Sequence, residues 1–352
     1  MALALLTPVS ALLAPLTISE LRVSLAAPRR TPELRDGQRR AALRRALRLP
    51  PREPPPSTSS LPPSPSPLTP SPQLELETSS GSSPTFAQSA DERATLARLS
   101  ALLADELPAS GAANSFQEVH GEARLLRFLR KAKGDADEAA ARYREMLEWR
   151  RDNGVDVVRG RLVAEQMAPA AMPHFELMQQ LMPVTIWHDE ADSGAVPGVP
   201  NGEGHGVQTF HIGRWDARGM VEARRTGALS EAEFLRHWTY ANEYVSLQLE
   251  RLSRERGSVA ELQLVCDFSG ANLRQISRSC SRSFFRMTAP WAKMSQDNYP
   301  STSADIVFLN APAFFTGIWG LVSPMIGEQT RSKIRFASSA SSTEERAASP
   351  GY

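Results

Sequence analysis

An uncharged stretch near the end of the chain limits the possible folds more than any other feature. No charged side chain lies between Asp305 and Glu328, and residues 306–322 read IVFLNAPAFFTGIWGLV. A membrane span needs about 20 apolar residues in one helix. Pro312 interrupts this run, because the residue before a proline is pushed away from α-helical geometry. The sequence therefore predicts a strand at 305–310, a separate short helix after the proline, and no membrane span.

Composition narrows the class of protein. The chain has 352 residues, 41% of them hydrophobic, and a formal net charge of +1. That length accommodates one or two domains with sizeable cores. The near-zero charge gives no electrostatic reason to expect a nucleic-acid partner. Cys266 and Cys280 form neither a disulfide framework nor a zinc-ligand spacing, so we interpret them as free thiols.

Residues 1–88 have the composition of a disordered leader. The first 55 residues contain arginine but no lysine, and residues 50–73 are rich in proline and serine, which keeps such a segment from burying a core. An Arg-rich leader also resembles an organelle transit peptide, which leaves plastid or mitochondrial targeting open. The Ser/Ala-rich residues 337–352 predict a second disordered tail.

Three helices are predicted in a small helical domain at 89–160. Residues 90–107 show helical spacing of apolar residues, with Asp91 as the capping candidate at their start. A second helix lies within 115–133. The third, at 135–154, begins with acidic and ends with basic residues, which complements the helix dipole, and stops at Asn153-Gly154.

Strands and helices alternate in the second domain, 161–336. Strands are predicted at VTIWHDE, VQTFHIG, VAELQLVCDF and DIVFLN, and helices at 230–256 and 279–300. The apolar VAELQLVCDF is typical of a strand buried on both faces. This alternation predicts an α/β fold with a mainly parallel sheet.

Five segments, in order, resemble the CRAL-TRIO lipid-transfer family. They are the helical stretch ARLLRFLRKAKGDADEAAARYREMLEWRRDNGVD, then VCDFSG, DNYPS, FLNAPAFF and TRSKI, and together they cover about 116–336. The resemblance implies a helical N-domain followed by an α/β domain whose deep apolar pocket holds one lipid beneath a mobile gate helix. The glycine-containing, apolar segment from Ala313 corresponds to that gate, and a buried core helix is the alternative reading.

The resemblance also implies lipid-binding residues. Thr330 and Lys333 in TRSKI match positions that contact an inositol headgroup, and a lysine with a threonine hydroxyl can bind a phosphate. Ser301 follows the YP of DNYPS. Phe314, Phe315, Ile318 and Trp319 of the gate segment are expected to face lipid.

Two departures from the family argue against phosphatidylinositol as the preferred ligand. Ser301 stands where phosphoinositide carriers have a glutamate, and Ala132 stands where they have an arginine. Each inositol hydroxyl left without a partner costs on the order of 1–3 kcal/mol. Lys131 and Lys133 flank Ala132, and either of them could replace the arginine.

The sequence therefore predicts a carrier that binds one phospholipid, isoprenoid or sterol-like lipid and transfers or presents it between membranes. A lipid-sensing adaptor that recruits a partner through its N-terminal region is the alternative. No G-x-S-x-G, P-loop, H-E-x-x-H or G-x-G-x-x-G motif occurs, so we expect no enzyme and no cofactor. We expect a cytoplasmic monomer that contacts membranes transiently.

One group of polar residues has the composition, but not the spacing, of a metal site. Its members are His188, Asp189, Glu190, His205 and His211. Their spacing matches no established metal-binding pattern, so we expect no metal.

Overall fold

The computed structural model describes residues 86–109, 112, 116–188, 196, 205–271, 278–300, 302–312, 315, 319 and 331–338, without the side chains of 278–282 and 285. These residues form one five-stranded sheet in the order β1-β2-β3-β4-β5. The strands are β1 (Val184–Thr185), β2 (Gly206–Phe210), β3 (Leu262–Asp267), β4 (Ser303–Leu309) and β5 (Ile334–Ala337).

The α-helices of the described residues fall into an N-terminal group and a group that packs on the sheet. The first comprises α3 (Ala90–Leu102), α4 (Gln117–His120), α5 (Glu122–Lys131), α6 (Ala136–Asp152) and α7 (Val155–Ala164). The second comprises α8 (Phe175–Leu181), α9 (Ala217–Thr226), α10 (Glu231–Arg256) and α11 (Arg278–Asn298).

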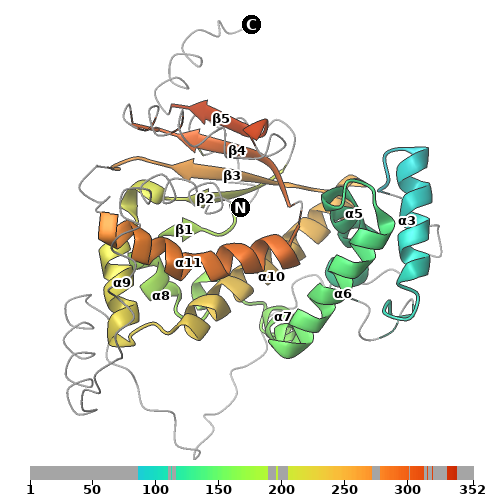
Figure 1. Cartoon of the computed structure of the whole chain (residues 1–352), viewed down its shortest axis with the longest axis horizontal. Coiled ribbons are helices and arrows are strands. Elements are labelled where there is room, and N and C mark those ends of the chain that lie inside the picture. The colour runs from blue at the N-terminus through green and yellow to red at the C-terminus, as the bar shows by residue number, and fades with distance from the viewer. Residues whose placement is uncertain are drawn as a thin grey trace, which may run out of the picture.

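The sheet topology places the second group of helices on one face. β1 pairs antiparallel with β2, whereas β2, β3, β4 and β5 pair in parallel, each with the next. Successive parallel strands joined by right-handed crossovers put every connecting helix on the same side of the sheet. Figure 1 shows α8, α9, α10 and α11 below the sheet, with α3, α5 and α6 beyond its end. The predicted α/β fold with a mainly parallel sheet is confirmed.

The central strands are buried on both faces. In β3, Leu262, Leu264 and Cys266 join the large core formed with the helices, whereas Val265 joins a separate cluster on the opposite face. All residues from Leu262 to Cys266 are buried, as the unbroken apolar pattern predicted. The side of the sheet that faces α10 and α11 therefore carries every second residue of each strand.

The N-terminal helices have a core of their own. Leu99 of α3, Leu126 and Phe128 of α5, and Tyr143 and Met146 of α6 are all buried in one cluster. The rings of Phe128 and Tyr143 meet edge-on with centroids 5.4 Å apart. This core holds α5 in place. The last residue of α5, Lys131, lines the cavity described below.

Helix ends differ from the sequence prediction at two points. Ser89, rather than Asp91, caps α3, because its side chain accepts a hydrogen bond from the Glu92 N–H at 3.0 Å. The second predicted helix is divided at Gly121 into α4 and α5. A Cβ at Gly121 would lie 2.4 Å from the Gln117 carbonyl oxygen, so only glycine fits there.

The third predicted helix ends where expected, and one strand is shorter than expected. α6 is capped by Asn153, and Gly154 has a φ of 60°, in the left-handed region. The predicted strand VTIWHDE pairs only at Val184 and Thr185 among the described residues.

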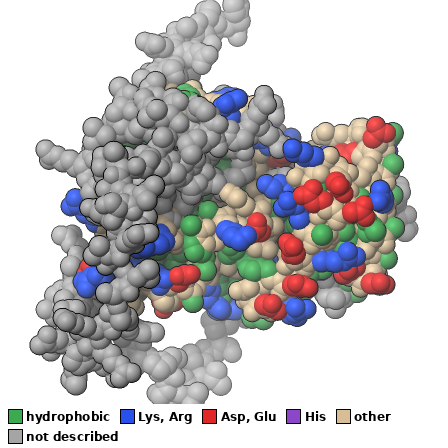
Figure 2. Space-filling model, viewed as in Figure 1, with side chains coloured by type: hydrophobic (Ala, Val, Ile, Leu, Met, Phe, Trp, Pro, Cys, Tyr) green, Lys and Arg blue, Asp and Glu red, His purple; other side chains and the backbone are tan. Residues whose placement is uncertain are grey.

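The surface over the N-terminal helices is polar and of mixed charge. Figure 2 shows basic and acidic side chains interspersed on this face. Three ion pairs contribute, namely Arg98–Asp137, Arg144–Glu106 and Arg130–Glu92. Each helix of the described residues is too short or too polar to cross a bilayer.

Candidate functional site

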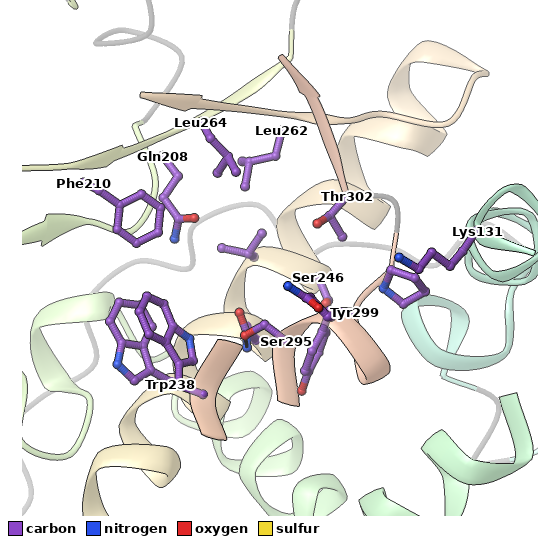
Figure 3. Close-up of a pocket in the computed structure, with 15 residues that line it drawn as sticks. Lys131, Gln208, Phe210, Trp238, Ser246, Leu262, Leu264, Ser295, Tyr299 and Thr302 are labelled. Carbon is purple, nitrogen blue, oxygen red and sulfur yellow. Dashed lines mark hydrogen bonds between the residues drawn. The ribbon is translucent and has the colours of Figure 1, made fainter. Parts of the chain in front are cut away.

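A cavity of about 80 Å³ lies between the sheet and the helices α10 and α11. β2 and β3 supply its roof and the two helices its floor (Figure 3). Its lining residues are Lys131, Gln208, Phe210, Trp238, Asn242, Val245, Ser246, Leu262, Leu264, Trp291, Ser295, Gln296, Tyr299, Pro300 and Thr302. Binding pockets for drug-sized ligands usually measure about 300–1,000 Å³, so in this conformation the cavity is largely closed by side chains.

Three aromatic rings close one end of the cavity. The indoles of Trp238 and Trp291 stack with centroids 3.9 Å apart and planes inclined by 17°. Phe210 of β2 lies 6.2 Å from each of them. Trp238 Nε1 is buried and has no hydrogen-bond partner among the described residues. Such an orphaned donor is costly in an apolar interior, and an acceptor on a ligand would remove that cost.

Polar side chains line the other end. Figure 3 shows Ser246, Tyr299 and Thr302 between Trp238 and Lys131, with Lys131 at the far end. The amide of Asn242 donates to Ser295 Oγ at 3.0 Å and joins α10 to α11 beneath the cavity. The cavity is therefore amphipathic along its length, with aromatic rings at one end and a lysine at the other.

A buried ion pair supports the cavity floor from below. Arg150 of α6 donates to the two carboxylate oxygens of Glu243 in α10 at 2.8 and 3.0 Å, and both side chains are almost fully buried. The Tyr299 hydroxyl donates to the same carboxylate at 2.6 Å. Burial alone would lower the pKa of Arg150, but the Glu243 carboxylate outweighs it and the pKa is raised. Burial, followed by the Glu243 charge, raises the pKa of Tyr299 well above its usual value.

Two arginines of α5 join the N-terminal helices to the same region. Arg124 donates to the Asn298 carbonyl at 2.5 Å, and its guanidinium lies 5.2 Å from the ring centroid of Tyr299. Arg127 donates to the carbonyl of Ala260, just before β3. Burial lowers the pKa of Arg127 to about 10, which still leaves it charged at neutral pH. These contacts fix α5, and with it Lys131, relative to the cavity.

Lys333 lines an open hollow beside the cavity. Its ammonium donates to the Ser303 carbonyl at 2.7 Å. It lines an open hollow of about 480 Å³ between the N-terminal helices and the sheet, together with Lys133 and Arg130. Acidic side chains line the same hollow, namely Asp91, Glu92 and Glu261. Ala132 is buried, and Lys131, not Lys133, is the neighbour that reaches the cavity.

The described gate residues pack on the helix-covered side of the sheet. Phe315 is buried, and its ring lies 4.7 Å from that of Phe268 and 5.6 Å from that of Phe308. Trp319 lies 5.6 Å from Phe308. The other predicted site residues, Ser301, Phe314, Ile318 and Thr330, lie outside the described residues. The gate helix stays a prediction.

The polar group near the first strands makes hydrogen bonds within the protein. His188 Nε2 lies 2.8 Å from Thr209 Oγ1, and His211 Nε2 lies 3.2 Å from Thr185 Oγ1. His211 Nδ1 also lies 3.7 Å from Asp267 Oδ2. Within the described part of the chain no three His, Cys, Asp or Glu side chains come together as a metal site would require. Asp189 and Glu190 are not described.

Sequence reasoning did not single out the cavity-lining residues of α10 and α11. Trp238, Trp291, Asn242 and Ser295 are not among the site residues that the sequence predicts. Helical periodicity finds an inward-facing residue but does not distinguish a packed core from a cavity wall. The polar Asn242 within the apolar face of α10 is the one signal that was present.

His237, beside Trp238, makes stability depend on pH. It is fully buried, its Nδ1 lies 2.8 Å from the Pro173 carbonyl, and burial lowers its pKa from 6.5 to about 4. Between pH 6.5 and about 4, His237 is protonated in the unfolded chain but neutral in the folded chain. The free energy of unfolding is therefore expected to fall as the pH is lowered through this range. The loss is expected to total about 3 kcal/mol.

The measurement is urea unfolding between pH 7 and 4 on the protein and on His237→Asn. Asparagine has an N–H that can donate to Pro173 but does not titrate in this range. The variant is expected to lose less stability than the parent as the pH falls. Parallel loss in the two proteins would assign the pH dependence to other groups, among them His120 and His211, whose pKa values burial also lowers.

Known proteins similar to this chain include a domain family and two relatives. Residues 201–346 match the family described as CRAL/TRIO domain. The chain is 25% identical over 213 residues to the protein real-time of Anopheles gambiae, covering 60% of this chain and 27% of that protein. It is 23% identical over 211 residues to phosphatidylinositol/phosphatidylcholine transfer protein SFH7 of Arabidopsis thaliana, covering 60% of this chain and 34% of that protein.

A solved structure is also similar. The crystal structure of Sfh5 aligns with a TM-score of 0.44 and 14% identity over 71% of this chain and 81% of that one. This chain spans about a third or less of the length of the curated relatives named above. The matched region, 201–346, contains VCDFSG, DNYPS, FLNAPAFF and TRSKI in the order that suggested the resemblance. The predicted resemblance to the CRAL/TRIO family is therefore confirmed for residues 201–346.

Proposed function

We propose that the chain binds one hydrophobic lipid in the cavity between β2, β3, α10 and α11, and transfers or presents it between membranes. The amphipathic cavity carries this proposal, because an aromatic end and a polar end match the two parts of a membrane lipid. The match of residues 201–346 to the CRAL/TRIO family, and the name of the Arabidopsis relative, support lipid as the ligand class. The proposal involves no covalent reaction.

Energetics explain why a carrier needs such a site. Each methylene moved out of water contributes about 0.8 kcal/mol, so a free lipid crosses water only against a large barrier. A protein that surrounds the chains with apolar groups lowers that barrier. The present cavity is too small for a whole lipid, so binding must separate side chains such as those of Trp238 and Trp291.

The gate segment completes the proposed site. In this proposal the uncharged segment 313–327 covers the cavity and meets the membrane. Phe314, Phe315, Ile318 and Trp319 are its lipid contacts, and Ser301, Thr330 and Lys333 are further lipid-binding residues. The packing of Phe315 and Trp319 against Phe308 supports it, because Phe308 belongs to the sheet face that α10 and α11 also cover.

The proposed domains remain 89–160 and 161–336.

The proposal is tested with the full chain and a variant that blocks the cavity. Ser246→Trp places an indole in the cavity, whereas Gln248→Trp adds the same side chain to α10 at a position that does not line it. After incubation with phosphatidylcholine vesicles, native mass spectrometry should show about one unmodified lipid per chain. Ser246→Trp should reduce the bound fraction at least tenfold, and the control should not.

Transfer is measured separately, as movement of a fluorescent phospholipid between donor and acceptor vesicles. Ligand-free protein after every vesicle incubation would overturn the proposal. Bound lipid without any transfer would favour the adaptor function instead.

A further inference from the structure

The lysine at the end of α5 is unusual among the residues around the cavity. Of the described residues that line it, Lys131 alone carries a formal charge. The buried carboxylate of Glu243, below the floor, is already paired with Arg150 and Tyr299. The cavity thus has one cationic end, and none of the described residues lining it is a carboxylate.

The other basic residues of this region are in a different electrostatic setting. Lys133 and Lys333 line the neighbouring open hollow, which Asp91, Glu92 and Glu261 also line. The ammonium of Lys333 is already bonded to the Ser303 carbonyl. Acidic side chains at that hollow offset the positive charge and disfavour an anion there.

The backbone explains why two lysines only two residues apart reach different places. α5 ends at Lys131, and Lys133 and Gly134 both have positive φ, 55° and 88°. This left-handed turn reverses the chain, so Lys131 lines the cavity and Lys133 lines the hollow. Between them Ala132 is buried and offers no polar group. The cation at the cavity is thus supplied by a residue that helix geometry, rather than a motif, places there.

We propose that Lys131 binds the anionic phosphate of a lipid headgroup, and that the cavity selects anionic phospholipids with a small head over zwitterionic ones. This rests on the proposed function. The phosphate lies at the Lys131 end, where the hydroxyls of Thr302 and Ser246 provide further donors, and an apolar chain extends toward Phe210, Trp238 and Trp291. A choline group would bring a second cation to Lys131 with no lining carboxylate to pair with it.

Charge-assisted hydrogen bonds set the size of the expected effect. A bond from an ammonium to a phosphate contributes enough to change affinity about ten- to hundredfold. Lys131→Gln should therefore weaken binding of phosphatidic acid about ten- to hundredfold and binding of phosphatidylcholine by less, so that the preference for phosphatidic acid is lost. Lys131→Arg should retain the preference, because it keeps the charge.

The experiment is competition between phosphatidic acid and phosphatidylcholine in mixed vesicles, read as the identity of the lipid bound to the full chain by native mass spectrometry. Lys133→Gln is the matched control, since it removes one charge from the same turn but not from the cavity. Both lysines are exposed, so neither substitution should unfold the protein, and thermal unfolding verifies this. Inorganic phosphate alone is a further arm.

Each outcome decides the question. Loss of the phosphatidic acid preference in Lys131→Gln but not in Lys133→Gln supports the proposal. An unchanged preference in Lys131→Gln, or an equal loss in both variants, overturns it and attributes selectivity to general surface charge. Displacement of bound lipid by inorganic phosphate would also overturn it, by showing a site for free anions. Parent protein that binds neither lipid would refute the proposed function itself.

Discussion

Replacing Glu243 with alanine is expected to lower the free energy of unfolding by about 3–5 kcal/mol. The variant leaves the almost fully buried guanidinium of Arg150 with the half-exposed Asp156 as its remaining counter-ion among the described residues. It also removes the acceptor of the Tyr299 hydroxyl, a wall of the cavity. Urea unfolding followed by circular dichroism measures the loss.

Two further variants distinguish the cost of leaving Arg150 buried and unpaired from the cost of removing any carboxylate. Glu138→Ala breaks an exposed pair with Arg142 one helical turn away and should cost less than about 1 kcal/mol. The double variant Arg150→Met/Glu243→Leu should recover much of the loss, because no unpaired charge is left buried. A cost for Glu243→Ala no larger than that for Glu138→Ala would contradict this account.

Trp238→Ala is the second substitution for which we expect a large effect. Trp238 is buried, stacks on Trp291 and lies against Phe210, so its truncation should lower the free energy of unfolding by about 3–5 kcal/mol. The same change enlarges the cavity. If a lipid occupies that space, saturating the variant with phospholipid should offset part of the loss, because a ligand that binds only the folded state stabilises it.

Thermal and urea unfolding with and without bound phospholipid provide the measurement. Trp149→Ala is the control, because Trp149 is only half-buried, meets Tyr299 edge-on at 6.0 Å and does not line the cavity. It should cost less, and lipid should not change that cost selectively. An equal effect of lipid on both variants would show that the enlarged space beside Trp291 is not where lipid binds.

Local signals predicted much of the fold. The long helix 230–256 was expected where α10 begins with a capping box of Ser230 and Glu233 and ends at Gly257. The strand at 305–310 lies within one or two residues of β4. The ends of α10 and β4 are set by residues close in the chain, namely the caps, the glycines and Pro312. Such local signals can be recognised directly in the sequence.

Contacts between residues far apart in the chain could not be predicted from such local signals. Arg150 and Glu243 are 93 residues apart, and both look like ordinary charges on helix surfaces until the helices pack and bury them. The Trp238–Trp291 stack likewise joins α10 and α11, two helices that β3 separates in the sequence. Short strands such as β1 depend on a partner, here β2, rather than on their own pattern.

Residue order and local backbone chemistry were enough to predict the α/β class, the division of the apolar run at Pro312 and the resemblance to the CRAL/TRIO family. Which basic residue meets the cavity depends instead on how the helices pack on the sheet. The sequence allowed Lys131, Lys133 and Lys333, and the left-handed turn after α5 and the packing of Arg124 and Arg127 place Lys131 at the cavity. The physical reason is that a side chain's electrostatic role depends on the groups around it in space, which residue order alone does not specify.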